Sequence, residues 1–189
     1  MKSNIVLVGF MGTGKTSVGT QLAEMLEMQF IDTDEIIEKD SGMSISEIFA
    51  KMGEDHFRDL ESRTIERVSK LERQVIATGG GAVKREKNLQ NLKNSGIVFC
   101  LYASPEIILQ RTSRYNHRPL LQVDDPVIKI NEMLKEREQF YTKADYMIDT
   151  SKLTIDQVVE KIQSIFYKSK DDRNQKTKSI SWLKNIKKI

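Results

Sequence analysis

Residues near the start of the chain have the types and spacing that hold a nucleoside triphosphate. The stretch Gly9-Phe-Met-Gly-Thr-Gly14-Lys15-Thr16 fits G-x-x-x-x-G-K-[ST], the P-loop pattern. Glycines let the backbone fold around a phosphate with its N–H groups inward, and the following helix presents its positive end to the anion. Lys15 would reach the β- and γ-phosphates, and the Thr16 hydroxyl would bind Mg²⁺. An ordinary glycine-rich turn is the alternative, but the whole pattern rarely arises by chance in a chain this long.

A pair of carboxylates follows the second apolar run. Asp32 and Asp34 stand on either side of Thr33. One carboxylate can help to hold Mg²⁺ through its water shell, and the other can accept a proton from a substrate hydroxyl. The alternative is that Asp32 caps the next helix, which would use only one of the two carboxylates.

A run of three glycines ends the segment Val75-Ile-Ala-Thr-Gly79-Gly80-Gly81. In many P-loop proteins this strand ends in an acidic residue for the metal, and here glycines take that place. They predict a close approach of the backbone to a ligand, with N–H groups available to it. A tight turn is the alternative, although it would need only one or two glycines.

Arginines in the second part of the chain could bind anionic groups. Arg58 begins a long amphipathic pattern, Arg111, Arg114 and Arg118 lie in a polar stretch without a period, and Arg137 lies on the next helical pattern. A single arginine is most often a solvated surface residue. A basic aperiodic stretch, about residues 112–125, is typical of a lid that closes over phosphates, and a pair of arginines is a natural clamp for a carboxylate.

Strand and helix patterns alternate along the chain. The predicted strands are Ile5–Val8, Gln29–Ile31, Val75–Thr78, Ile97–Tyr102 and Tyr146–Asp149. Helices are expected at Thr16–Leu26, Ile36–Asp40, Ser46–Met52, Phe57–Leu71, Asn88–Asn94, from Ser104, at Pro126–Tyr141 and at Ile155–Tyr167. This order predicts an α/β fold of three layers, αβα, with a central parallel sheet of about five strands. Ligands bind at the carboxyl ends of such strands, so the motifs above should meet at one edge.

Composition limits the remaining classes. The 189 residues suit one domain, residues 1–167, and a basic tail, residues 168–189, that we expect to be flexible. The tail has a net charge of +6 and the whole chain +3, so the body, at −3, is mildly acidic and gives no sign of nucleic-acid binding. Cys100, the single cysteine, cannot form a disulfide within the chain. Without a signal peptide or a membrane-spanning run, we expect a cytoplasmic protein without membrane partners and, lacking a heptad seam, a monomer.

The sequence resembles the shikimate kinase family, P-loop kinases related in fold to the nucleoside monophosphate kinases. The resemblance runs from about Asn4 to Tyr167 and rests on six segments in order: GFMGTGKTS, FIDTDEII, FRDLE, VIATGGGAV, RPLL and REQFYTKAD. It implies transfer of the γ-phosphoryl group of ATP to the 3-hydroxyl of shikimate, with Mg²⁺, in the pathway to aromatic amino acids. It also implies a substrate-binding insert at about residues 33–61.

The resemblance implies a role for each matched residue. Those on the nucleotide side are Gly12, Thr13, Gly14, Lys15, Thr16, Ser17, Arg111 and Arg118. Those on the shikimate side are Asp34, Arg58, Gly79, Gly80, Gly81 and Arg137. Lys15, Asp34 and Arg118 would be catalytic, with Asp34 as the base, and Arg58 and Arg137 would hold the carboxylate. Thr16 would bind Mg²⁺ directly and Asp32 through a water molecule, while Arg111 and the backbone after Thr150 would lie against adenine.

Three alternatives remain at this point. A GTPase switch is suggested by Thr142-Lys-Ala-Asp145, which matches the guanine-reading [NT]-K-x-D element but follows a helical pattern instead of a strand. A gluconate-type kinase would share the P-loop and lid, but not the DTD and GGG segments. A non-catalytic nucleotide-binding regulator would have little need for Lys15, Asp34 and the arginines together. Spacing and composition alone do not distinguish shikimate from another small polyol acid.

Overall fold

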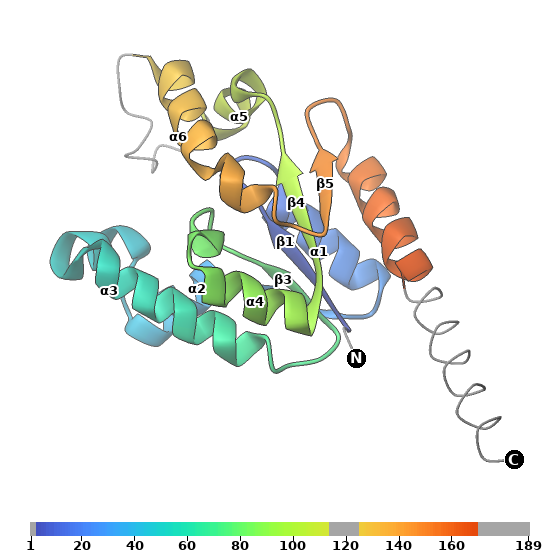
Figure 1. Ribbon diagram of the computed structural model, residues 1–189, viewed down its shortest axis with the longest axis horizontal. Coiled ribbons are helices and arrows are strands. Elements are labelled where there is room, and N and C mark those ends of the chain that lie inside the picture. Colours follow the sequence, from blue (N-terminus) through green and yellow to red (C-terminus); the bar gives the residue numbers. More distant parts are fainter. Residues whose placement is uncertain (1–2, 114–124, 170–189) are drawn as a thin grey trace, which may run out of the picture.

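A five-stranded parallel sheet forms the centre of the protein (Figure 1). The computed structural model describes residues 3–113 and 125–169. The strands are β1 (Asn4–Val8), β2 (Gln29–Asp32), β3 (Gln74–Ala77), β4 (Gly96–Tyr102) and β5 (Tyr146–Asp149), in the order β2-β3-β1-β4-β5. In register, Ile5 of β1 lies opposite Val75 and Ile97. The predicted fold class is confirmed, and the strand bounds match the predictions to within one residue.

Helices follow each strand and cover both faces of the sheet (Figure 1). They are α1 (Lys15–Met25), α2 (Thr33–Ser41), α3 (Ile45–Val68), the 3₁₀ turn η1 (Ala82–Lys84), α4 (Glu86–Ser95), α5 (Pro105–Thr112), α6 (Pro126–Tyr141) and helical residues 155–169. Their starts follow from local chemistry. Ser44 and Glu47 form a capping box at the start of α3, and Ser104 caps α5 ahead of a proline at its first turn.

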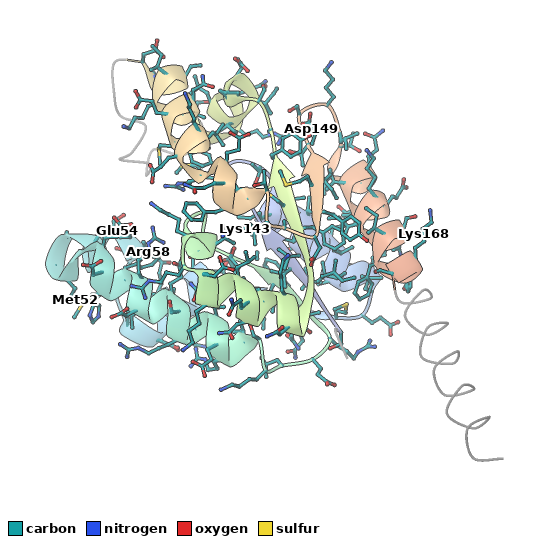
Figure 2. The ribbon with its side chains drawn as sticks, viewed as in Figure 1. Met52, Glu54, Arg58, Lys143, Asp149 and Lys168 are labelled. Atoms are coloured by element: carbon teal, nitrogen blue, oxygen red, sulfur yellow. The ribbon has the colours of Figure 1, made fainter. Side chains whose placement is uncertain are left out.

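Helix α3 is continuous apart from a break at Gly53, where the sequence predicts two separate helices, Ser46–Met52 and Phe57–Leu71. Gly53 has φ 84° and ψ 170°, which are not helical values, and the helix resumes directly after it. A positive φ is open to glycine at little cost, whereas an L side chain would be strained there. The break therefore divides α3 into a short segment ahead of Gly53 and a long segment that carries Arg58 (Figure 2).

Alternate residues of the strands pack into two separate cores. On one face Val6, Val98 and Cys100 contact the buried sides of α3, α4, α5 and α6. On the other face Ile5 and Phe99 pack against α1 and the helical residues 155–169. The sheet is thus buried on both faces, which fixes the positions of its carboxyl ends.

Several helix boundaries differ from the predictions: α2 begins at Thr33 and α4 at Glu86, each ahead of its predicted start, and two further differences bear on the site and the domain. Arg111 and Thr112 belong to the last turn of α5, where Thr112 is buried, because the helix continues into the stretch predicted to lack a period. The last helix continues to residue 169, beyond the predicted end of the domain at residue 167. The rest of the predicted lid, residues 114–124, and of the basic tail, residues 170–189, lies outside the described residues. Within the described ranges no helix is long and apolar enough to cross a membrane.

Candidate active site

The P-loop joins β1 to α1 at the carboxyl edge of the sheet. Gly14 is the N-cap of α1 and has φ 96°, a left-handed value that suits glycine. The first residue of the helix is Lys15, and its Nζ donates hydrogen bonds to the carbonyl oxygens of Gly9 and Phe10 at 2.9 and 2.8 Å. These bonds hold the ammonium group over the loop. The loop, the helix N-terminus and the lysine together form an anion-binding site.

The side chains next to Lys15 have different surroundings. Thr13 is buried and its hydroxyl donates to the carbonyl oxygen of Phe10 at 2.8 Å, so only its backbone N–H can serve a phosphate. Thr16 and Ser17 are exposed, and Thr16 Oγ1 donates to Asp32 Oδ2 at 3.3 Å. A hydroxyl and a carboxylate side by side are hard oxygen ligands that suit Mg²⁺. In the described part of the chain no cluster of three or more His, Cys, Asp or Glu could hold a metal, so nucleotide phosphates would supply the remaining ligands.

A cleft of 490 Å³ extends from the P-loop between α5 and the helical residues 155–169. It is lined by Gly12, Thr13, Gly14, Ser17, Val18, Gln110, Arg111, Thr150, Leu153, Thr154, Ile155 and Val158. Arg111 Nη2 donates to the carbonyl oxygen of Thr150 at 2.7 Å, and Nη1 donates to the Thr150 hydroxyl at 3.0 Å. The structure thus brings Arg111 and the backbone after Thr150 to one cleft that opens on the P-loop. Sequence reasoning missed the apolar lining residues, which lie on α1 (Val18) and on the last loop and helix (Leu153, Ile155 and Val158).

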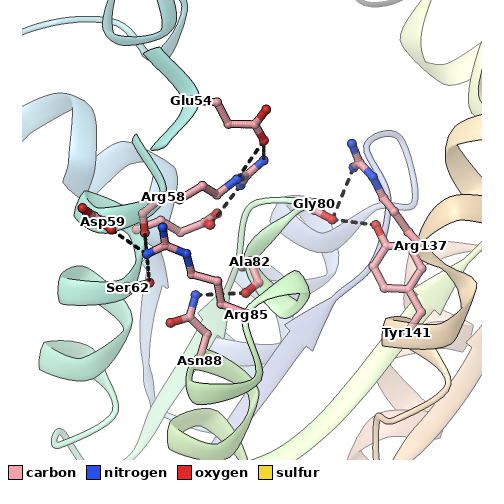
Figure 3. A network of polar contacts seen from close by, with 11 residues as sticks. Glu54, Arg58, Asp59, Ser62, Gly80, Ala82, Arg85, Asn88, Arg137 and Tyr141 are labelled. Atoms are coloured by element: carbon pink, nitrogen blue, oxygen red, sulfur yellow. Dashed lines mark hydrogen bonds and ion pairs between the residues drawn. The ribbon is translucent and has the colours of Figure 1, made fainter. Parts of the chain in front are cut away.

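The glycine triplet after β3 is packed against charged side chains; Figure 3 shows Gly80 of this triplet with Arg58 and Arg137. A Cβ atom at Gly79 would lie 2.7 Å from Asp34 Oδ1 and 2.9 Å from Glu61 Oε1. At Gly80 it would lie 3.4 Å from Arg137 Nη1, and at Gly81 it would lie 2.6 Å from both terminal nitrogens of Arg58. Two carboxylates and two guanidinium groups therefore line a stretch of three residues. Gly79 and Gly81 are glycine because these side chains occupy the space that a Cβ atom would need, whereas a Cβ atom at Gly80 would be at ordinary contact distance.

Asp32 and Asp34 have separate roles in the structure. Asp32 Oδ1 accepts from the backbone N–H of Asp34 at 3.0 Å and caps α2, so the helix-capping interpretation holds alongside the contact with Thr16. Asp34 Oδ1 is buried and has no hydrogen-bond partner among the described residues. Burial, followed by the charges of Asp32 and Glu61, raises the pKa of Asp34 to about 7, although Lys15 acts in the opposite direction. A carboxyl group in this state can take up a proton near neutral pH.

Arg58 lies between two carboxylates of its own helix. Its Nη1 donates to Glu61 Oε2 at 2.9 Å, and its Nε and Nη2 donate to Glu54 Oε1 at 3.1 and 3.0 Å. The Glu61 side chain is fully buried, and burial raises its pKa despite the opposing charge of Arg58. Sequence reasoning missed Glu61, although its position three residues after Arg58 on a helix is a spacing that places side chains together.

Arg137 approaches the triplet from α6, on the opposite side from Arg58 (Figure 3). Its guanidinium carbon lies 5.2 Å from the centre of the Phe10 ring, and Nη1 donates to the Gly80 carbonyl at 3.4 Å. Its Nε is buried without a hydrogen-bond partner among the described residues. The hydroxyl of Tyr141, one turn later on α6, donates to the same Gly80 carbonyl at 2.7 Å. Sequence reasoning missed Tyr141 as well.

Two of the predicted arginines cannot be placed. Arg114 and Arg118 lie outside the described residues, so the role of Arg118 stays a prediction. The remaining predicted residues lie along one edge of the sheet, with the nucleotide group around the P-loop and the substrate group around Gly79–Gly81.

Comparison with known proteins decides the family. A family model described as shikimate kinase matches residues 11–166. The chain belongs to the shikimate kinase family. Among curated members, a shikimate kinase of Thermodesulfovibrio yellowstonii is 54% identical over 84% of this chain and 92% of its own length. One from Caldanaerobacter subterraneus is 50% identical over 88% of this chain and 98% of its own.

Solved structures agree with the family assignment. The structure of a shikimate kinase from Acinetobacter baumannii in complex with shikimate has a TM-score of 0.84 and 42% identity, over 89% of this chain and 94% of that one. A gluconokinase from Sinorhizobium meliloti, with a TM-score of 0.62 and 17% identity over 93% and 97% of the two chains, shares the fold. The shikimate kinase family is thus separated from the gluconate alternative by sequence identity, and not by fold.

The geometry also removes support for the GTPase alternative. Thr142 is the C-cap of α6, so the Thr142–Asp145 element follows a helix. Asp145 Oδ2 accepts from the backbone N–H of Val98 at 2.9 Å, and Lys143 pairs with Glu86 at 2.7 Å. In this member of the shikimate kinase family both side chains therefore join elements of the fold, and neither is placed to read a base.

Proposed function

We propose that the protein transfers the γ-phosphoryl group of ATP to the 3-hydroxyl of shikimate, giving shikimate 3-phosphate and ADP. The observation that carries the proposal is the charge arrangement around Gly79–Gly81, next to the P-loop. Arg58 and Arg137 offer two guanidinium groups to one carboxylate, and Asp34 offers a carboxylate to a hydroxyl. A small acid that carries hydroxyl groups matches this set, and membership of the shikimate kinase family supports shikimate as that acid.

Each residue has a distinct step in the proposed reaction. Arg58 and Arg137 bind the carboxylate and thereby orient the ring, which converts the encounter into a positioned reaction. Asp34 accepts the proton of the 3-hydroxyl as the oxygen attacks the γ-phosphorus, and the bond to the β,γ-bridging oxygen breaks to release ADP. A pKa of about 7 suits this exchange near neutral pH. Lys15 and the loop N–H groups neutralise charge that develops on the phosphates.

The nucleotide would lie in the cleft that runs from the P-loop past Arg111 and Thr150. Gly12, Thr13 and Gly14 would offer backbone N–H groups, and Ser17 a hydroxyl, to the phosphates. Thr16 would hold Mg²⁺ directly and Asp32 through a water molecule, which fits their 3.3 Å contact. Mg²⁺ held there would supply positive charge that offsets the negative charge of the nucleotide phosphates. Arg118 would reach the transferred phosphoryl group from a lid at about residues 112–125. The monomeric state and cytoplasmic location stay predictions.

The test is release of ADP from Mg·ATP with shikimate, gluconate, a nucleoside monophosphate or no acceptor, run side by side. We expect turnover with shikimate alone. Turnover that requires gluconate and not shikimate would contradict the proposed acceptor. If ATP binds but no acceptor stimulates ADP release, the proposed reaction is wrong. Lys15→Ala serves as the control for ADP release by a contaminating enzyme, because it should lose on the order of several kcal/mol of transition-state stabilisation.

A further inference from the structure

Three of the five N–H groups of the Arg58 guanidinium donate to carboxylates. Glu61 accepts one bond, from Nη1, and Glu54 accepts two, from Nε and Nη2. Nε and Nη2 form one edge of the planar fork, and a pair of parallel N–H groups of this kind is what a bidentate carboxylate uses. Glu54 therefore occupies an edge of Arg58 that would suit a substrate carboxylate.

The two carboxylates differ in their freedom to move. The side chain of Glu61 is 0% exposed and its Oε1 faces Gly79, whereas the side chain of Glu54 is 57% exposed. Glu54 is also the first residue after the break at Gly53, one turn ahead of Arg58. Glu54 and Arg58 lie on the side of α3 that is turned toward α6 (Figures 2 and 3). Glu61 is thus a buried, fixed partner of Arg58. Glu54 is a partly solvated partner, which can leave Arg58 and turn into the solvent.

We propose that Glu54 is a place-holding carboxylate, which occupies the substrate edge of Arg58 until the carboxylate of the acceptor displaces it. This inference rests on the proposed function, because it takes Arg58 as a ligand of that carboxylate. The exchange replaces one charge-assisted pair by another, so it reduces the net gain from binding an acid. It also sets specificity, because a neutral analogue has no group that can take the place of Glu54.

The two arginines of the site have different partners: Arg58 is paired with carboxylates, whereas Arg137 contacts a carbonyl and a ring. The proposed exchange at Arg58 accounts for this difference. Arg137 contacts the Gly80 carbonyl and the Phe10 ring, and its Nε has no partner among the described residues. It can receive an incoming carboxylate without giving up an ion pair seen in the described part of the chain. Arg58 closes on the carboxylate only after Glu54 has left.

The test compares Glu54→Gln with Asp55→Asn, a matched loss of one exposed acid on the next residue. Steady-state KM and the dissociation constant for shikimate are measured with the full chain. We expect Glu54→Gln to lower both by about two- to fivefold, the range that an exposed ion pair is worth, with kcat and the KM for ATP unchanged. Asp55→Asn should leave all of them unchanged. The neutral methyl ester of shikimate should bind Glu54→Gln and wild type alike.

The opposite outcomes are equally clear. A higher KM for shikimate in Glu54→Gln would mean that Glu54 supports Arg58, and an unchanged KM would mean that no exchange occurs; either result overturns the inference. Glu54→Asp keeps a charge at the helix start but shortens the side chain, so it should also lower KM and provides a second test if the glutamine variant folds poorly. Absence of shikimate turnover in the wild type would instead defeat the proposed function itself.

Discussion

The hydroxyl of Tyr141 donates a 2.7 Å hydrogen bond to the carbonyl oxygen of Gly80, which also accepts a 3.4 Å bond from Arg137. Tyr141 is buried and lies four residues after Arg137 on α6. Burial raises the pKa of Tyr141 to about 12, so the hydroxyl remains a donor at neutral pH. The bond joins α6 to the glycine triplet and thereby sets the position of Arg137 relative to Arg58.

Removal of this hydroxyl should act on the acceptor alone. In Tyr141→Phe we expect the KM for shikimate to rise by about two- to tenfold, the value of one neutral hydrogen bond, with kcat and the KM for ATP nearly unchanged. Steady-state kinetics with each substrate varied in turn measures this. Tyr167→Phe, at an exposed tyrosine of the last helix, is the control. An equal rise in both KM values would point to a general loss of structure in place of a positioning role.

Loss of either arginine of the clamp should raise the KM for shikimate by at least tenfold, because a charge-assisted hydrogen bond contributes about 1.5–3 kcal/mol. Arg58→Ala should also lower the free energy of unfolding, by about 3–5 kcal/mol, because it leaves the buried Glu61 without its partner. Arg137→Ala leaves no such buried charge and should destabilise less.

A second substitution separates the two effects of Arg58→Ala. Adding Glu61→Gln removes the unpaired charge and should restore most of the stability without restoring the KM. Urea unfolding and steady-state kinetics on the same preparations measure both. If neither Arg58→Ala nor Arg137→Ala changes the KM for shikimate, the carboxylate clamp is wrong.

Local patterns predicted the sheet and the positions of the motifs. Apolar runs gave the strands. Gly9 and Gly79 follow the ends of β1 and β3, and Asp32 is the last residue of β2, so parallel topology alone brings them to one edge. The capping box at Ser44 and the proline at the start of α5 are equally local. Such features depend on a few neighbouring residues, and the printed sequence contains all of them.

The partners within the site could not be read in the same way. Glutamate in a charged helix is normally a surface residue. The burial of Glu61 depends on how α3 packs against the triplet, which the sequence does not show. Tyr141 reaches Gly80 across 61 positions of sequence, a separation for which no local pattern exists. The glycine triplet was predicted to allow a ligand close to the backbone. In the structure its neighbours are the charged side chains themselves, which only the tertiary arrangement reveals.

The three glycines should tolerate alanine to different degrees. A Cβ at Gly79 or Gly81 would lie 2.6–2.9 Å from the ends of Asp34, Glu61 or Arg58, whereas at Gly80 the nearest atom is 3.4 Å away. The crowded atoms are the ends of side chains, so the protein can fold while the site is displaced. We expect Gly79→Ala and Gly81→Ala to raise the KM for shikimate more than Gly80→Ala does, with the KM for ATP similar in all three. A larger effect at Gly80 would contradict the packing described for the triplet.

Asp34→Asn should separate turnover from stability. Turnover with shikimate should fall by about 10²–10⁴-fold because the base is lost, while ATP binding is retained. The wild-type rate should rise with pH as Asp34 ionises, through a pKa of about 7. Rates measured from pH 5.5 to 8.5, with ATP binding measured in parallel, test both expectations. A variant that turns over normally would exclude Asp34 as the base.

The carboxyl group of Asp34 should also make the free energy of unfolding depend on pH, with lower stability at higher pH. The pKa of Asp34 is raised from 3.8 to about 7, chiefly by burial, so the folded state binds the proton more tightly than the unfolded chain. Its contribution to stability is present below pH 3.8 and is lost as the pH rises through 7. Asparagine stays neutral, so Asp34→Asn should exceed the wild type in free energy of unfolding by up to about 4 kcal/mol at pH 8, and by less at pH 5. Urea unfolding without nucleotide or metal measures this, with Asp55→Asn as the control for loss of an exposed charge. Lower stability of Asp34→Asn at pH 8 would mean that the ionised carboxylate is stabilised in the fold, and the raised pKa would then be wrong.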